Sequence, residues 1–118
     1  MNLNDLAKIL DARFLCGEDQ ADTEVIAACS ADLMSDVMAF VKDRVVLLTG
    51  LVNAQVIRTA DLMDIKVIVF VRGKQPSADL LDMARDAGIA LLATRHTLFM
   101  ASGLLYEAGL RRGGNRKI

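Results

Sequence analysis

Apolar residues in this 118-residue chain gather in short runs, and each run is followed by a segment of helical periodicity. The clearest example spans residues 45–61, where Val45–Thr49 predicts a buried strand and Gly50 a tight turn into a helix. The buried face of that helix is predicted at Val56, Ile57, Ala60 and Met63. The runs Val67–Val71 and Ile89–Ala93 also lead into a loop and a helix, so the pattern predicts parallel strands with right-handed crossovers.

The first forty residues predict two more helices and two more strands. Asn4 is expected to cap a helix that lies on the sheet, and Ser30 to cap another with Asp32 in its first turn. The apolar stripe of the second helix is predicted at Leu33, Met34, Val37, Met38 and Val41. The runs Ala12–Cys16 and Val25–Cys29 predict strands and are candidates for an antiparallel pair.

The second half of the chain carries clear helix boundaries. Pro76 and Ser77 are expected to open one helix that Gly88 ends, and Thr97 to open a last helix that ends at Gly109. The apolar side of the last helix is predicted at Leu98, Ala101, Leu105 and Ala108. The fold class is therefore α/β, a single three-layer-like domain over residues 1–110 with strand–loop–helix repeats and a mostly parallel central sheet, followed by a basic C-terminal tail over residues 111–118.

Composition adds an expectation about assembly and location. Apolar residues make up 53% of the chain and aromatic residues only 4%, and the mean hydropathy is +0.35. This value is high for a small domain with a large surface, so we expect some apolar surface to be buried in a homodimer. No run is long enough to span a bilayer and no signal-peptide pattern is present, so a cytoplasmic location and no membrane association are expected.

The charges are distributed unevenly although the formal net charge is −1. The tail holds Arg111, Arg112, Arg116 and Lys117, which leaves the body with fewer cations than acids. An acidic body argues against a nucleic-acid surface, and the tail reads as a solvated end in preference to a binding arm. Cys16 and Cys29 do not form a CxxC pair or join a Cys/His cluster, so reduced, buried thiols and no metal site are expected.

The ends of the predicted parallel strands supply the candidate site. Loops that follow parallel strands meet at one edge of a sheet, which is where ligands bind in such folds. The residues expected there are Thr49, Gly50, Asn53, Arg72, Gly73, Lys74, Thr94, Arg95 and His96. Backbone N–H groups at helix starts and the nearby cations favour a phosphate-like anion. Two other interpretations stay open, in which the cations only decorate exposed loops or the ligand sits in the dimer interface.

The motifs of several enzyme classes are missing. Thr49–Gln55 lacks the Gly-Lys-Ser/Thr of a phosphate-binding loop, and no GxGxxG follows any predicted strand. His96 is the only histidine and has no obvious nucleophile beside it in sequence. Catalytic residues and a cofactor are therefore not expected. The methionines Met34, Met38, Met63, Met83 and Met100 read as core residues.

Five segments together resemble a known family. Ser30–Val37, Val46–Gly50, Gln55–Ala60, Ile68–Lys74 and Gly88–Thr94, in this order, resemble a stand-alone DRTGG domain. The chain is similar also to the N-terminal, non-catalytic domain of HPr kinase/phosphorylase. The resemblance implies an α/β regulatory module, usually dimeric and without catalytic residues of its own, of a kind that occurs beside CBS domains in regulated pyrophosphatases.

Two functional hypotheses follow. In the first, the protein is a regulatory or ligand-binding module that senses a nucleotide or phosphorylated metabolite and acts on a partner enzyme or kinase. In the second, it is an accessory or scaffolding subunit of an enzyme or signalling complex and binds no small molecule. A thermal-shift screen with nucleotides and phosphorylated metabolites distinguishes them.

Overall fold

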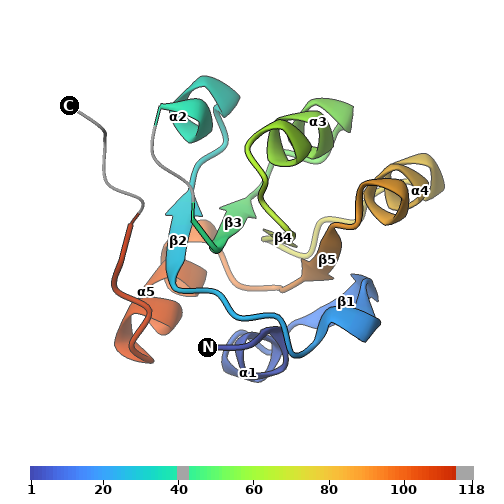
Figure 1. The fold of residues 1–118 in the computed structure, drawn as a ribbon. Coiled ribbons are helices and arrows are strands. Elements are labelled where there is room, and N and C mark those ends of the chain that lie inside the picture. The colour runs from blue at the N-terminus through green and yellow to red at the C-terminus, as the bar shows by residue number, and fades with distance from the viewer. Residues whose placement is uncertain (40–42, 114–118) are drawn as a thin grey trace.

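A five-stranded sheet forms the centre of the molecule (Figure 1). The computed structural model describes residues 1–39 and 43–113. Along the chain the elements are α1 (Leu3–Ile9), β1 (Arg13–Cys16), η1 (Glu18–Gln20), β2 (Ala27–Ser30), α2 (Met34–Met38), β3 (Val45–Thr49), α3 (Ala54–Leu62), β4 (Val67–Phe70), α4 (Ala78–Ala87), β5 (Ala90–Ala93) and α5 (Leu98–Glu107). The strand order in the sheet is β1-β5-β4-β3-β2.

The strands β2 to β5 pair in parallel with their sequence neighbours, and β1 runs antiparallel to β5. The register places Val46 beside Val67, and Val67 beside Ala90. Every residue of β3, β4 and β5 is buried, because helices cover both faces of a parallel sheet. The predicted α/β class with a mostly parallel central sheet is confirmed.

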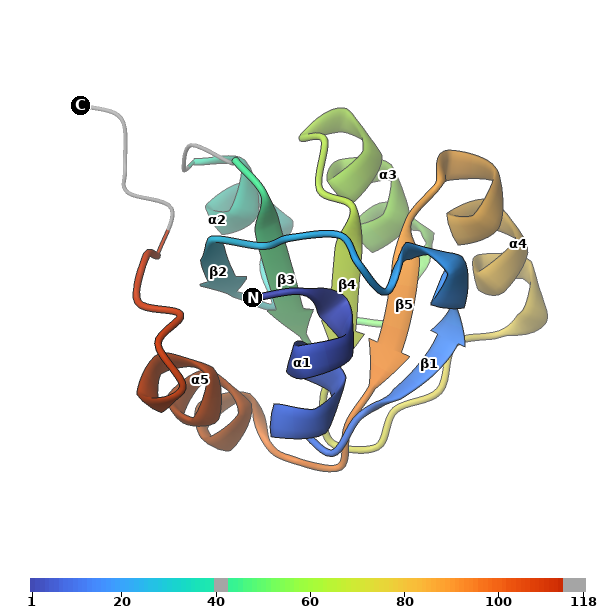
Figure 2. The same ribbon diagram turned by 60° about the horizontal axis from the view of Figure 1, so that its bottom comes forward.

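Helices lie on both faces of the sheet and make it the middle of three layers. Figures 1 and 2 show α2, α3 and α4 on one face and α1 and α5 on the other. Alternate strand residues point to opposite faces, so Leu47, Ile68 and Leu91 join one core cluster, whereas Val46 and Val69 join the other.

Local sequence explains where several helices begin and end. The side chains of Asn53, Ser77 and Thr97 accept a hydrogen bond from the backbone N–H three residues later, which starts α3, α4 and α5. Gly88 ends α4 at φ +71°, a left-handed conformation that glycine adopts without strain. The predicted caps at Ser77, Gly88 and Thr97 are confirmed.

Three expectations for the N-terminal part are wrong. The cap of α1 is Asn2 and not Asn4, because the helix begins at Leu3 and Asp5 completes a capping box with Asn2. Ser30 belongs to β2 and does not cap α2, whose N-cap position is Leu33.

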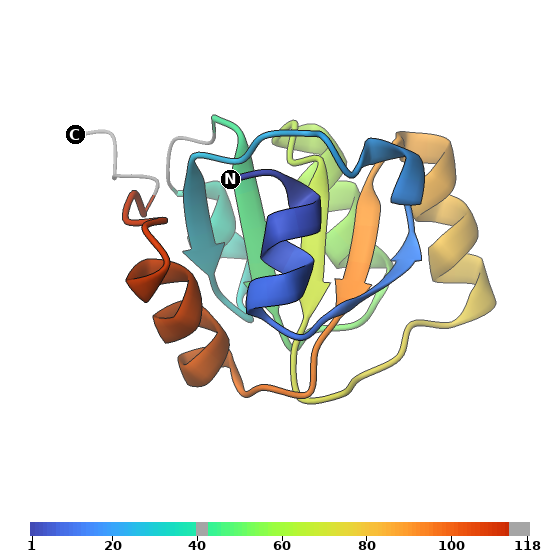
Figure 3. The same cartoon turned by 90° about the horizontal axis from the view of Figure 1, so that it is seen from below.

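The expected antiparallel pairing of β1 with β2 is also wrong, because these strands form opposite edges of the sheet. The connection between them is too long for a tight hairpin and contains η1. Figure 3 shows it passing along the amino ends of the parallel strands.

Several side chains expected in the core are exposed. Leu33 and Met38 lie at the surface because Met34 and Val37 form the buried side of α2, and Ala108 and Met100 lie on the outer side of α5. Val41 falls outside the described residues. Of the expected tail, the described part contacts the sheet edge, since the Arg112 carbonyl accepts a hydrogen bond from the Ala28 N–H at 2.9 Å. Arg116 and Lys117 lie outside the described residues.

Candidate functional site

The residues predicted for the ligand site lie at the carboxyl ends of β3, β4 and β5. Thr49 ends β3 and Asn53 caps α3, whereas Arg72 to Lys74 follow β4 and Thr94 to His96 follow β5. The loops after β4 and β5 are joined directly, because the Arg72 N–H donates to the His96 carbonyl at 2.8 Å and the Gly73 N–H to the Thr94 carbonyl at 2.9 Å. The geometry divides this edge into two different parts.

At the end of β3, a side chain of the protein itself occupies the backbone donors. One carboxylate oxygen of Asp32 accepts hydrogen bonds from the Gly50 N–H at 2.7 Å and from the Thr49 hydroxyl at 3.2 Å. The Thr49 hydroxyl in turn accepts from the Leu51 N–H at 3.1 Å. An anion at this loop would have to displace Asp32, so the donors of Thr49 and Gly50 are already occupied within the protein.

The side chain of Arg72 lies against Gly50 at the end of β3. A methyl group added at Gly50 would overlap the guanidinium of Arg72, and its Cζ lies 3.2 Å from that methyl position. Arg72 itself has φ +60°, an uncommon conformation for a residue with a side chain. Glycine at position 50 therefore makes room for Arg72 to fold over the end of β3.

The sheet edge is hollow at the carboxyl end of β5, beside the start of β1 and the loop after β4. The loop after β4 leaves toward α4 on one face, and the loop after β5 leaves toward α5 on the other (Figure 3). In open α/β sheets, ligands usually bind at the carboxyl ends of the strands, near the point where neighbouring loops leave toward opposite faces. A pocket of about 440 Å³ lies at this place, and it is lined by Asp11, Ala12, Arg13, Gly73, Gln75, Ala93, Thr94 and Arg95. We refer to it as the strand-end crevice.

Thr94 connects the segment before β1, which lines the strand-end crevice, to the end of β5. Its buried hydroxyl donates to the Leu10 carbonyl at 2.7 Å and accepts from the His96 N–H at 3.3 Å. The hydrogen bond to the Leu10 carbonyl holds the connection between α1 and β1 in place. The antiparallel pairing of β1 with β5 then places Arg13 beside Ala93. Thr94 thus acts as a support, and it brings Arg13 to the crevice.

The charges of the strand-end crevice are predominantly positive. Arg13 and Arg95 line it with Asp11 as the one acid, and all three side chains are exposed. Within the described part of the chain, neither arginine forms an ion pair or a side-chain hydrogen bond. Two guanidinium groups therefore keep their donors available for a carboxylate or a phosphate.

The structure brings together only part of the predicted set. Gly73, Thr94 and Arg95 line the strand-end crevice, whereas Thr49, Gly50 and Asn53 belong to the β3 end. Arg72, Lys74 and His96 are sequence neighbours of the lining residues but are not part of the lining. The sequence interpretation missed Asp32, Asp11, Arg13 and Gln75. No local motif marks the first three, since they reach this edge through strand pairing and long-range hydrogen bonds.

The two cysteines lie away from this edge, in the core. Both are buried and free of disulfides, as predicted. Burial raises the pKa of the Cys16 thiol, whose Sγ donates to the Ile89 carbonyl at 3.5 Å. A buried thiol with a raised pKa is a poor nucleophile at neutral pH. Among the described residues, no group of three or more His, Cys, Asp or Glu side chains could hold a metal ion.

Fold and site together define an open α/β domain with a cationic crevice at the carboxyl end of β5. A family model of the DRTGG domain matches residues 5–108. The match spans most of the chain, and the protein therefore belongs to the DRTGG domain family, as the resemblance predicted.

A solved structure from Clostridium perfringens has a similar fold. It contains the CBS and DRTGG domains of the regulatory region of a pyrophosphatase, complexed with the activator diadenosine tetraphosphate. The TM-score is 0.72 at 18% sequence identity. The alignment covers 88% of the present chain and 45% of the other, so this chain spans less than half of that regulatory region. A search of curated proteins gave no match.

Among the described residues, no helix is both long enough and apolar enough to cross a membrane.

Proposed function

We propose that this DRTGG domain is a regulatory module that binds a nucleotide or another phosphorylated metabolite in the strand-end crevice. The observation that carries the proposal is the pair of arginines, Arg13 and Arg95, that line the crevice and have no acceptor among the described residues. A volume of about 440 Å³ lies within the usual range of about 300–1,000 Å³ for small-ligand sites. The guanidinium groups would hold the phosphate, and the polar backbone beside Gly73 would contact the rest of the ligand.

Ligand binding would be transmitted through the loops that form the crevice. The loop after β4 leads into α4, the loop after β5 leads into α5, and Thr94 connects both to α1. A ligand between these loops would change their relative position and so the surfaces of helices on both faces of the sheet. A partner enzyme or kinase that contacts those helices would sense the change.

The similar structure supports a regulatory role of this general kind. In the Clostridium perfringens pyrophosphatase, a region of DRTGG and CBS domains is regulatory and is complexed with a phosphorylated dinucleotide. We propose by analogy that the present domain acts in regulation, has no catalytic activity of its own and works as a cytoplasmic homodimer.

A second function is favoured by a different observation, the exposed apolar side chains on the helices. Phe99 and Leu62 are 84% and 72% exposed. Such side chains suit an accessory or scaffolding subunit that holds a partner protein and binds no small molecule.

A thermal-shift screen with nucleotides and phosphorylated metabolites tests the proposal. A ligand that binds only the folded state at a concentration of 100 times its Kd adds about 2.7 kcal/mol of stability, which raises the melting temperature by several degrees. The proposal expects such a rise for at least one phosphorylated compound, and expects it to disappear when Arg13 and Arg95 are both replaced by Ala. A screen without any shift would favour the accessory subunit.

A further inference from the structure

Asp11 is the one carboxylate in the lining of the strand-end crevice, and it stands at a position that does not favour an aspartate. Its φ is +49°, a left-handed conformation that costs energy for a residue with a side chain. It also follows the carboxyl end of α1, where the helix dipole disfavours a negative charge. Both effects destabilise the folded chain, so the fold by itself does not explain this residue.

The ends of two other helices show which residue the fold prefers at this position. The Asp11 N–H donates to the carbonyl three residues earlier, and the next N–H along the chain donates to the carbonyl five residues earlier. The same pair of hydrogen bonds ends α4 at Gly88 and α5 at Gly109, both of which have positive φ. Glycine is the usual residue in this motif. Asp11 therefore replaces the residue that would serve the helix end best.

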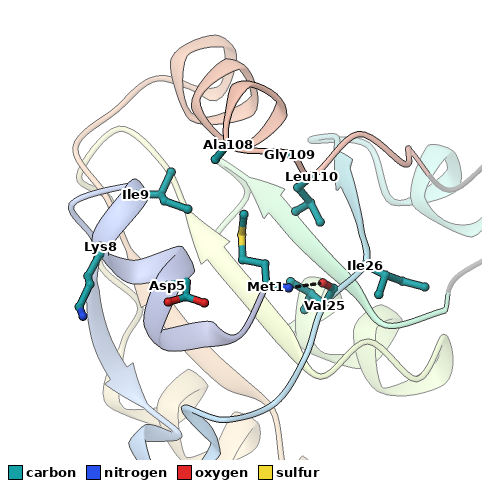
Figure 4. A pocket seen from close by; sticks show the side chains of 9 residues that line it. All are labelled: Met1, Asp5, Lys8, Ile9, Val25, Ile26, Ala108, Gly109 and Leu110. Carbon is teal, nitrogen blue, oxygen red and sulfur yellow. Dashed lines mark hydrogen bonds between the residues drawn. The ribbon is translucent and has the colours of Figure 1, made fainter.

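Other aspartates of the chain have partners within the protein. The helix α3 ends with the same motif at Asp64, but Asp64 Oδ1 lies 3.1 Å from Lys66 Nζ. Figure 4 shows Asp5 beside a second hollow, between α1 and the end of α5, and this carboxylate accepts from the Asn2 N–H in the cap of α1. Over residues 1–39 and 43–113, Asp11 has neither an ion pair nor a side-chain hydrogen bond. Its oxygens remain available to a ligand.

The polar side chains of the strand-end crevice offer both donors and acceptors. Arg13 and Arg95 can only donate hydrogen bonds, the Asp11 carboxylate can only accept them, and the exposed amide of Gln75 does both. An anionic group satisfies the two arginines but is repelled by Asp11. A ligand that uses the whole lining must therefore carry hydroxyl groups, which donate to Asp11 and Gln75, in addition to its anionic group.

The lining offers little to a nucleobase. None of the described residues that line the strand-end crevice is aromatic, and its apolar side chains are those of Ala12 and Ala93. Proteins commonly bind exposed bases by stacking them on aromatic side chains, and each stacked base contributes substantially to affinity. A sugar needs no such surface, because its hydroxyl groups form hydrogen bonds with polar side chains.

We propose that the ligand of the strand-end crevice is a sugar phosphate, and that Asp11 selects it by accepting hydrogen bonds from the sugar hydroxyl groups. Arg13 and Arg95 hold the phosphate, as in the proposed function, on which this inference rests. The negative charge of Asp11 weakens the binding of a bare anion, and only a ligand that brings hydroxyl groups regains that loss. Asp11 is thus the residue that determines specificity.

Isothermal titration with four probes tests the class of ligand. Ribose 5-phosphate and glucose 6-phosphate should each bind at least about tenfold more tightly than inorganic phosphate, because their hydroxyl groups form hydrogen bonds with a charged acceptor. AMP is ribose 5-phosphate with adenine attached, so it should bind no more tightly than ribose 5-phosphate. Tighter binding of AMP would overturn the inference and leave the proposed function standing. Equal affinity for the sugar phosphates and inorganic phosphate would do the same.

Asp11→Asn removes the charge of this side chain and keeps its size. Asparagine also tolerates the left-handed backbone. The variant should bind glucose 6-phosphate about tenfold more weakly, since hydrogen bonds to an ionised acceptor are about twice as strong as neutral ones. It should bind inorganic phosphate about threefold more tightly, since a repelling charge is lost. A rise in both affinities would mean that Asp11 acts only through its charge, and would overturn the inference.

Two glycine substitutions form a matched pair that separates binding from stability. Asp11 and Asp64 both have positive φ at a helix end, but Asp64 lies at the amino ends of the parallel strands, beside Val67. Asp11→Gly should raise the melting temperature by a few degrees and abolish the preference for glucose 6-phosphate over inorganic phosphate. Asp64→Gly should leave that preference unchanged. A lower melting temperature of Asp11→Gly would assign the carboxylate to the fold and overturn its role in selection.

The results distinguish a failure of this inference from a failure of the proposed function. If none of the four probes bound, both would be overturned. If the probes bound in a manner that depends on Arg13 and Arg95 but not on Asp11, the proposed function would stand and the inference would be overturned. Binding of sugar phosphates that depends on all three residues would support both.

Discussion

At one edge of the sheet the end of β3 is filled by a side chain of the protein itself, whereas a hollow lies at the end of β5, beside the start of β1. The loops after β2 and β3 turn toward the same face, so Asp32 from the first reaches Gly50 and Thr49 in the second. The loops after β4 and β5 leave toward opposite faces (Figure 3), and a pocket of about 440 Å³ lies beside them, next to the start of β1. The direction in which the neighbouring loops leave thus decides whether a side chain of the protein fills the strand end or a pocket lined by Arg13 and Arg95 remains beside it.

The largest effect is expected from the arginines of the strand-end crevice. A hydrogen bond to a charged group contributes about 1.5–3 kcal/mol, so Arg13→Ala with Arg95→Ala should weaken a phosphorylated ligand by about 100-fold. Isothermal titration with the compound selected by the thermal-shift screen measures this. Arg58→Ala with Arg85→Ala removes two exposed arginines from α3 and α4 and serves as the control. An equal loss in both double variants would mean that general charge, and not the crevice, binds the ligand.

The β3 end should respond in stability and not in ligand binding. Thr49→Val keeps the volume of a fully buried side chain but removes the hydroxyl that donates to Asp32 and accepts from the Leu51 N–H. Buried groups left without partners cost about 1–3 kcal/mol, so the free energy of unfolding should fall by about 2 kcal/mol. Urea denaturation measures it, with Thr49→Ser as the variant that retains the hydroxyl. A large loss of ligand affinity at unchanged stability would contradict the assignment of the β3 end to structure and of the strand-end crevice to ligand binding.

The cations beside the strand-end crevice should have a smaller effect than those that line it. Arg72→Ala with Lys74→Ala should weaken the same ligand by about tenfold, since each nearby cation contributes about 1 kcal/mol or less. The melting temperature should hardly change, because both side chains are exposed. Unaltered affinity in this double variant would mean that Arg72 and Lys74 are exposed loop residues that do not contribute to ligand binding.

The smallest effect is expected at Gly73, which links the ends of β4 and β5. Its φ is +68°, and a Cβ there would meet only Arg95 Cγ, at 4.0 Å. Gly73→Ala should therefore lower the free energy of unfolding by about 1 kcal/mol through the left-handed backbone alone. Gly113→Ala, at a glycine without positive φ or close neighbours, should change it by a few tenths of a kcal/mol at most. Chemical denaturation of both variants measures the difference, and equal values would show that the backbone at Gly73 relaxes.

Local sequence patterns determined the helical caps and the buried strands of this protein. Ser77, Gly88 and Thr97 act within a few residues of their own position, so their roles follow from the chain alone. The continuous apolar runs that became β3, β4 and β5 are equally local signals, and their succession with helices predicted parallel pairing. The gathering of strand ends at one edge followed from this pairing, as expected.

Tertiary structure alone decided which of those strand ends stay open. Arg13 reaches the strand-end crevice because β1 pairs with β5, and Asp32 reaches Gly50 because β2 pairs with β3. Both contacts join residues that are far apart in sequence. The exposure of Phe99 likewise depends on how α5 lies against the sheet. An amino-acid sequence specifies periodicity and capping through near neighbours, whereas the pairing of distant segments depends on the packing of the whole domain. The sequence by itself therefore determined the α/β framework, and only the folded chain decided which of its cations line a crevice and which apolar side chains stay exposed.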